Sequence, residues 1–399
     1  MTLSPRHAAQ AHILMPRLET PFHSRLAALS EVNDWYTWSG YKAPHSLADA
    51  ELEYFAIRST AALFDISPMV KYRIAGPDAE RYLNRLTVRD VRKLGVSRVH
   101  YTAWCDDHGH VLDDGTLFRF GPDEFRLCCQ ERHLPWLLDS AYGFAVTIAE
   151  ETEEIAGLAL QGPTSYAVLS AAGFDVARLK PFDVVTLDRV TISRTGFTGD
   201  LGYELFVPRD EALPLWDRLW AAGEAHGIRA IGYGALNQAR IEAGFIVANA
   251  DFMTAETALR ADRVRLPDEI GLDWLVDTEK PSFNGRAAIL AARRNQSLKH
   301  ILVGLEIEGN IPAEHAIVYH RGKHEAGIVT AGIWSPIAKR NIAIASLERP
   351  YGERFTDDLW VEIYALRELK YQKMMKRARI VPRPFVKLAR RSATPPGLR

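Results

Sequence analysis

The sequence predicts an α+β protein with a separate, all-β C-terminal domain. Three observations support this fold class. Helical and strand periodicities alternate before residue 290, only short β-rich runs follow Ile301, and the polar run ARRNQSLKH lies between the two regions. A chain of 399 residues, 47% of them hydrophobic, is long enough for two or three domains with real cores.

Residues 1–33 are weakly patterned and are interpreted as an arm or a peripheral helix, and order is expected to begin near Asp34. From Val70, a short strand leads through a Gly-Pro-Asp start signal into a helix. The apolar face of this helix is predicted to hold Ala79, Tyr82, Leu83 and Leu86. Residues 101–129 contain three alternating β runs separated by turn signals, which predicts an antiparallel meander.

The middle of the chain repeats the strand-to-helix pattern. IAGLALQGPTSYAVLSAAG is interpreted as a strand and a helix, and VVTLDRVTISRTGFTGDLGYELFVP as strands around a glycine-rich loop. EALPLWDRLWAAGEAHG and GALNQARIEAG predict two further helices. The runs ILVGLEIEG, AIVYHRG, EAGIVTAGIWS, NIAIASLE and LWVEIYALR predict a small β-barrel or sandwich.

Composition excludes several classes of function. The formal net charge of −1 argues against a surface built for nucleic acid or an anionic membrane. No apolar run approaches the roughly 20 residues that span a bilayer, and the three cysteines lack metal-ligand spacing, so we expect a cytoplasmic protein. His108 and His110 flank a turn glycine and are interpreted as exposed turn residues, so no metal is expected.

Two adjacent carboxylates interrupt an apolar strand in HVLDDGTLF. Successive side chains of a strand point to opposite faces, so either Asp113 or Asp114 must face the interior, where it needs hydrogen bonds or a ligand. A wet bulge explains the pattern equally well. In RTGFTGDLGYELF, Glu204 either points outward or is buried where it can accept paired donors, and Arg240 and Glu242 are too close along a helix to pair.

Together and in order, these segments resemble the folate-dependent aminomethyltransferase family. Its archetype is the T-protein of the glycine cleavage system, and it also includes tetrahydrofolate-dependent demethylases. The resemblance extends from about Asp34 to Val386. The blocks that carry it include WYTWSGYKAPHS, YTAWCDDHGHVLDDGTLF, SRTGFTGDLGYELFVP, GALNQARIEAGF, AGIVTAGIWSP and RARIVPRPFV.

The resemblance implies a cloverleaf of three domains around a central folate channel. The implied parts are a split folate-binding core (34–75 and 160–290), a ferredoxin-like part (76–159), a β-barrel or jelly-roll-like domain (300–390) and a tail (391–399). Asp113 matches the family's catalytic aspartate near folate N5, with Asp114 as its structural neighbour. The implied folate contacts are Tyr101, Asp113, Gln130, Phe197, Tyr203, Glu204, Arg240 and Trp274.

Several departures from the archetype lie around the expected channel. Leu236-Asn237 stands where a T-protein has Arg-Asp, Phe197 where it has Tyr and Gln130 where it has Asn, while residues 248–254 replace its GQEMD segment. The loss of an arginine removes a fixed charge and its bidentate contacts. These changes look closer to the demethylase branch, which implies transfer of a methyl group from a small S-, O- or N-methylated compound to N5 of tetrahydrofolate.

Two other functions stay open. One is an aminomethyltransferase that acts on a lipoyl carrier protein, and the other is a non-catalytic folate-binding protein, whose Lys-Gly-Cys-Tyr-x-Gly-Gln-Glu motif is absent from this sequence. For a demethylase, we expect aromatic walls around a cationic methyl donor. The candidates are Trp35, Tyr36, Trp38 and Tyr41, for which a place in the core is an equally good explanation.

Overall fold

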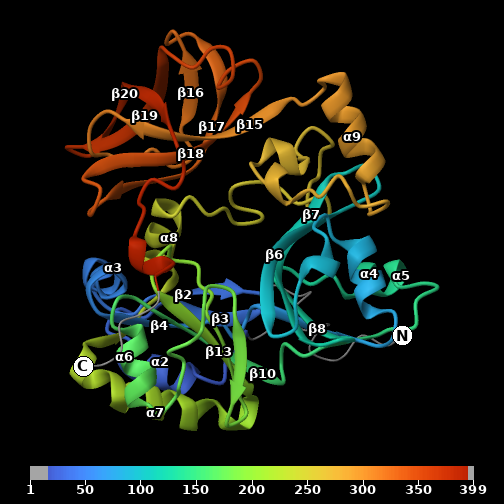
Figure 1. Ribbon diagram of the computed structural model, residues 1–399. Helices are drawn as coiled ribbons and strands as arrows, with labels where there is room; N and C mark the ends of the chain where they lie inside the picture. Colours follow the sequence, from blue (N-terminus) through green and yellow to red (C-terminus); the bar gives the residue numbers. More distant parts are fainter. Residues whose placement is uncertain (1–16, 394–399) are drawn as a thin grey trace.

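The computed structural model describes residues 17–393, so the first 16 residues of the predicted arm and the end of the predicted tail lie outside the described residues. The chain forms three lobes, which are coloured blue to green, cyan, and orange to red in Figure 1. Each lobe is built on its own sheet. The expected α+β class is confirmed.

The first lobe contains a six-stranded sheet in the order β11-β12-β13-β10-β4-β14. Its strands are β4 (Ala61–Asp65), β10 (Ile155–Gln161), β11 (Val184–Leu187), β12 (Val190–Ser193), β13 (Gly202–Pro208) and β14 (Ile228–Ala230). Its helices are α2 (His23–Leu29), α3 (Ala50–Ser59), α6 (Ser165–Ala171), α7 (Ala212–Gly223) and α8 (Tyr233–Glu242). A small sheet of β1 (Leu18–Glu19), β2 (Asp34–Trp38) and β3 (Tyr41–Ser46) is attached to it.

The second lobe is a five-stranded antiparallel sheet in the order β6-β7-β8-β5-β9. Its elements are β5 (Val70–Ala75), α4 (Ala79–Leu86), β6 (Arg98–Cys105), β7 (Val111–Gly121), β8 (Glu124–Cys129), α5 (Leu134–Ser140) and β9 (Thr147–Glu150). The predicted meander is β6-β7-β8, and the four apolar residues predicted on one face of α4 are all buried.

The chain crosses between the first two lobes twice. It leaves the first sheet between β4 and β5 and returns to it between β9 and β10. β5 therefore pairs with β8 and β9 of the second lobe. This gives the first lobe its split character, and the finer boundaries expected at 75/76 and 159/160 stay predictions.

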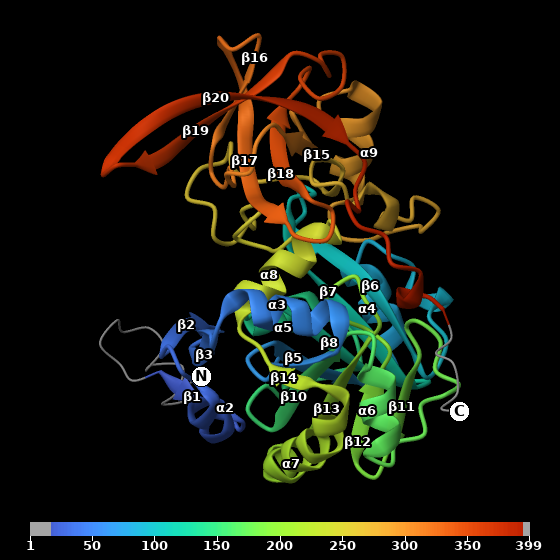
Figure 2. The ribbon, with the colours of Figure 1, turned by 90° about the vertical axis from the view of Figure 1, so that its left-hand side faces the viewer.

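The third lobe is a closed six-stranded barrel, which decides between the predicted barrel and sandwich. Its strands are β15 (His300–Ile307), β16 (Ile317–His320), β17 (His324–Ser335), β18 (Arg340–Glu348), β19 (Leu359–Arg367) and β20 (Lys370–Val381). Figure 2 shows the β19–β20 hairpin projecting beyond the barrel. Helix α9 (Arg286–Asn295) extends into the run predicted as a linker, and its Arg293 Nε lies 2.6 Å from Asp268 Oδ1, an ion pair that holds the last helical turn.

Helix α8 lies where the first lobe meets the barrel (Figure 1). The Glu242 carboxylate at its end accepts hydrogen bonds from Tyr54 Oη at 2.7 Å, from the Arg58 guanidinium and from Ser335 Oγ of β17. Arg240 on the same helix contacts other residues, so the prediction that the two do not pair is confirmed. Among the described residues, no helix is long and apolar enough to cross a membrane.

Candidate functional site

Strand β7 carries its two carboxyl groups on opposite faces. Phe118, two pleats from Asp114, packs in the core shared with the first lobe, whereas Leu117, on the face of Asp113, packs in the core of the second lobe. Asp113 is fully buried, so a wet bulge is excluded. Its Oδ1 accepts the Asp114 N–H at 2.8 Å, and its Oδ2 accepts the Glu131 N–H at 3.1 Å.

His133 gives Asp113 a third contact. Its Nε2 lies 3.0 Å from Asp113 Oδ2, and its Nδ1 lies 2.8 Å from Glu256 Oε2. The His133 N–H donates to Tyr72 Oη at 2.7 Å, and its ring meets Trp104 edge to face. Burial disfavours the charged ring, but the hydrogen bonds with the two carboxylates outweigh it and raise the pKa of His133 to about 9.

Asp114 faces the meeting point of the lobes. Its Oδ2 accepts the Tyr101 hydroxyl at 2.6 Å. Burial, and then the neighbouring Asp113 carboxylate, raise the pKa of Asp114 to about 7. The Trp274 ring, which is 62% exposed, lies 6.2 Å from the Tyr101 ring. A carboxyl group with this pKa can exchange a proton at neutral pH.

Charged groups from the other lobes reach this cluster. The Asp251 carboxylate raises the pKa of Asp114 further. Burial raises the pKa of Tyr101, and the Arg383 guanidinium partly offsets this. Asp251 pairs with Arg240 of α8 and also accepts the Thr330 hydroxyl of β17 at 2.7 Å. Groups from all three lobes therefore set the electrostatics around the Asp114–Tyr101 pair.

The glycine-rich loop of residues 194–201 forms a second cluster. Glu204 on β13 is only 9% exposed, which excludes the outward alternative, and its Oε2 accepts the Thr195 hydroxyl at 2.5 Å. Burial raises the pKa of Glu204. Tyr203 points to the opposite face of β13, into the core of the first lobe.

A buried amide requires two glycines, Gly196 in this loop and Gly202 at the start of β13. A Cβ at Gly196 would lie 2.1 Å, and a Cβ at Gly202 2.3 Å, from atoms of the Gln161 side chain. Gln161 Oε1 in turn accepts the Thr198 hydroxyl at 2.8 Å. Close approach of Gln161 thus explains these two glycines.

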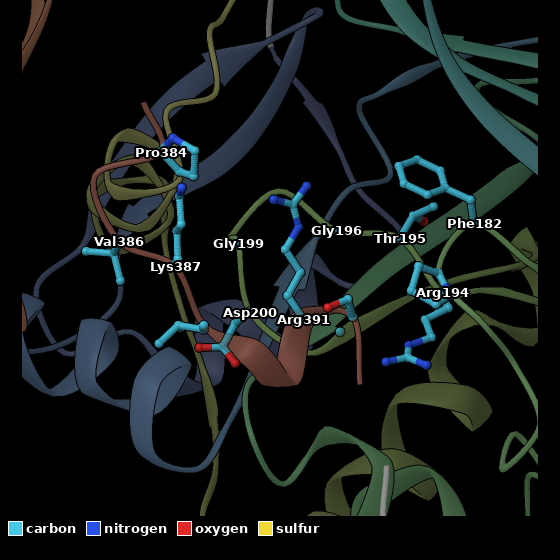
Figure 3. A pocket seen from close by; sticks show the side chains of 14 residues that line it. Phe182, Arg194, Thr195, Gly196, Gly199, Asp200, Pro384, Val386, Lys387 and Arg391 are labelled. Carbon is cyan, nitrogen blue, oxygen red and sulfur yellow. The ribbon is translucent and has the colours of Figure 1, made fainter. Parts of the chain in front are cut away.

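A cavity of about 420 Å³ lies between this loop and the C-terminal segment (Figure 3). Arg391, from the short helix η6 (Ala389–Arg391), points into it. Its guanidinium carbon lies 5.1 Å from the centre of the Phe245 ring, which stacks on Phe197 at 5.3 Å. Pro384, next to Arg383, also lines the cavity, so the C-terminal segment joins the two clusters.

The four aromatic residues predicted to surround the methyl donor have different neighbours. Tyr36 lies 5.1 Å from the Tyr233 ring at the start of α8, and Trp38 stacks on Phe64. Trp35 faces His23 of α2. Tyr41 is 2% exposed.

The predicted folate contacts thus lie in several places. Tyr101 and Trp274 lie on the side of Asp114, Asp113 points to the opposite face of β7, and the Gln130 carbonyl accepts the Ser39 hydroxyl at 3.0 Å. Phe197 and Glu204 belong to the loop cluster, Tyr203 packs in the core of the first lobe, and Arg240, 2% exposed, contacts Asp251 and the Phe245 carbonyl between the two clusters. Sequence reasoning missed His133, Glu256, Tyr233 and Arg383. The polar run Gln-Glu-Arg-His directly after β8 was the available signal for His133.

Two family models match this chain. The family model described as the GCVT N-terminal domain matches residues 21–280, and that of the glycine cleavage T-protein C-terminal barrel domain matches residues 301–387. The trimethylamine-oxide aldolase of Ruegeria pomeroyi is 33% identical over 353 residues, which are 84% of this chain but only 43% of that protein. The chain therefore spans less than half the length of this relative.

Other relatives match over most of their length. The aminomethyltransferase of Bacillus subtilis is 31% identical over 361 residues, 88% of this chain and 94% of that protein. The crystal structure of the glycine cleavage system aminomethyltransferase T from Bartonella henselae superposes with a TM-score of 0.82. It covers 93% of this chain and 99% of that one at 22% identity, which shows a common fold.

Proposed function

The chain belongs to the glycine cleavage T-protein family, and on that premise we propose that it transfers a methyl group from a small methylated compound to N5 of tetrahydrofolate. The observation that carries the proposal is the Asp114–Tyr101 pair where the three lobes meet. Family members of known activity transfer one-carbon groups.

The described residues fit a folate. The buried Glu204 carboxylate suits the paired N–H donors of a pterin edge, because two acceptor oxygens face two donors. The stacked rings of Phe197 and Phe245 offer a flat apolar wall. Lys387 and Arg391 bring positive charge to the cavity, where a folate carboxylate could be bound.

The transfer needs a base close to N5. It forms a bond between N5 and the methyl carbon, breaks the bond between that carbon and the donor heteroatom, which keeps the electron pair, and releases the N5 proton. We assign acceptance of this proton to Asp114, because Asp113, the expected catalytic residue, has both oxygens bonded within the protein. In this assignment Asp113 acts through its neighbour.

The donor surface is proposed on the side of Tyr36 and Tyr233. These rings lie together, and aromatic faces attract onium groups by about 0.5 to 2 kcal/mol per contact. Leu236 is 8% exposed, so an apolar side chain is buried where the archetype has arginine. The name of the Ruegeria relative specifies trimethylamine oxide, a small N-methylated compound, which favours donors of this chemistry.

A second candidate is an aminomethyltransferase acting on a lipoyl carrier protein. Several relatives that cover most of this chain have that name, including those of Caldanaerobacter subterraneus and Bacillus subtilis. In this activity the product is 5,10-methylenetetrahydrofolate, and the donor is an aminomethylated carrier.

One assay separates the two. The purified chain is incubated with tetrahydrofolate and a panel of sulfonium compounds, methylated amines and methoxyaromatics, and in parallel with aminomethylated carrier, and the folates are resolved by mass. We expect 5-methyltetrahydrofolate from at least one panel member. Methylene product from the carrier alone would replace the proposal by the second candidate.

A further inference from the structure

We propose that His133 is a positioning residue that bridges Asp113 and Glu256 as an imidazolium, holds Asp113 as a carboxylate, and so makes Asp114 the carboxyl group that exchanges a proton with the bound folate. The inference rests on the proposed function for the identity of the proton donor. The charge arrangement itself can be tested without turnover.

The hydrogen-bond geometry assigns the charges. Each ring nitrogen of His133 faces a carboxylate oxygen, at 3.0 Å for Asp113 and 2.8 Å for Glu256. When both acids are ionised they only accept hydrogen bonds, so both ring nitrogens donate and the ring is an imidazolium, in agreement with the raised pKa of His133. Asp113 in turn receives three N–H donors, from the Asp114 and Glu131 backbones and from the ring. This environment satisfies a carboxylate and offers little to a protonated carboxyl group.

The surroundings of Asp114, the neighbouring carboxyl group, favour its protonated form. Asp114 follows Asp113 directly on β7 but points to the other face, where it accepts a hydrogen bond from the Tyr101 hydroxyl. Two carboxylates this close resist simultaneous ionisation, so a proton taken up by the pair binds at Asp114. The imidazolium therefore decides which carboxyl group accepts the proton released from N5, and it also stabilises the doubly ionised pair.

Other charged and titratable groups face this pair from the surrounding elements. They are Tyr72 on β5, Tyr101 on β6, Cys129 on β8, and Asp251 and Arg383 from beyond the second lobe. Burial raises the pKa of Tyr72 and of Cys129, so both stay neutral at working pH. Asp251 is paired with Arg240, and burial lowers the pKa of the Arg383 guanidinium. His133 is thus the cation in direct contact with Asp113 that can be removed by one neutral substitution.

The test compares three single variants. His133→Gln keeps hydrogen-bonding capacity but removes the charge. Glu256→Gln removes the outer carboxylate, which is 55% exposed, and so lowers the pKa of His133. Tyr72→Phe is the matched control, because it deletes the acceptor of the His133 backbone N–H without changing any charge.

Turnover is measured against pH with a donor identified in the mass assay. We expect the acid limb of the kcat profile to move up by about one pH unit in His133→Gln, and by less in Glu256→Gln, because loss of a nearby cation raises the pKa of a carboxyl group. Tyr72→Phe should lower the midpoint of thermal unfolding and leave the limb in place. An acid limb that stays in place in both charge variants would overturn the proposal.

A second measurement works even if no donor is found. Histidine ¹⁵N chemical shifts of the wild-type chain, assigned by comparison with His133→Gln, should show a doubly protonated ring at pH 7.5. A neutral His133 at that pH would refute the charge assignment. Absence of methyl transfer together with a charged His133 would instead refute the proposed function alone.

Discussion

Replacing Asp114 by asparagine should stabilise the fold at alkaline pH while abolishing most turnover. An amide at this position still accepts the Tyr101 hydroxyl through its oxygen, so the local contact is kept. What is lost is a carboxyl group that must ionise in a site that resists its charge. Such a group destabilises the folded chain wherever the unfolded chain would be ionised.

The magnitude follows from the pKa. The carboxyl group goes from an ordinary value of 3.8 in the unfolded chain to about 7 in the folded chain. Between these values the folded chain keeps a proton that the unfolded chain has released, so stability falls as the pH rises from about 4 to about 7 and then levels off. At pH 8 the ionisation of Asp114 lowers the free energy of unfolding by at most about 4 kcal/mol, and roughly half of this loss occurs above pH 5.5.

The assay is denaturant unfolding of wild type and variant at pH 5.5 and pH 8. We expect the stabilisation by Asp114→Asn to be about 2 kcal/mol larger at pH 8. Asp113→Asn is the comparison, because it leaves the His133 imidazolium without a buried partner and should cost about 3 to 5 kcal/mol. With a working donor, Asp114→Asn should also lower kcat by about 10² to 10⁴.

A pH-independent effect of Asp114→Asn would show that this carboxyl group is not strained in the folded chain. Destabilisation equal to that of Asp113→Asn would show that the two aspartates have the same structural role. Either result would refute the division of roles between them.

Three further outcomes are expected. Glu204→Gln should weaken tetrahydrofolate binding by about 10- to 100-fold, measured by calorimetric titration, because a charge-assisted acceptor of the pterin edge is lost. Gly202→Ala should lower stability by about 1 to 3 kcal/mol in thermal unfolding, because its Cβ would lie 2.3 Å from Gln161, whereas Gly95→Ala, with only an ordinary contact at 3.6 Å, should change little. The stability that His133 contributes should be complete below pH 6.5 and lost as the pH rises through about 9, so the deficit of His133→Gln should shrink between pH 7 and pH 10.

Local patterns predicted the elements that depend on local physics. The apolar face of α4 is predictable because a helical period of 3.6 places its four residues together. The β6-β7-β8 meander is predictable because turn residues separate its strands. The barrel was predicted as one of two β architectures. Closure depends on the pairing of β15 with β20, whose order along the chain gives no local signal.

The site was predictable only in part. Glu204 and the Asp113–Asp114 pair attract notice as acids in apolar strands, but their partners come from remote segments. Glu256 lies 123 residues from His133 in the chain, and no spacing rule links them. Which aspartate faces the neighbouring lobe depends on the register of β7 in its sheet, and this register includes an irregularity at Trp104.

A deuterium label shows whether a donor methyl group reaches N5 intact. A donor from the panel that carries a CD₃ group is incubated with tetrahydrofolate and the purified chain, and the mass of the folate product is measured by mass spectrometry. We expect 5-methyltetrahydrofolate that retains all three deuterium atoms. A methylene product that retains two, or a product whose carbon comes only from an aminomethylated carrier, would refute the transfer of an intact methyl group.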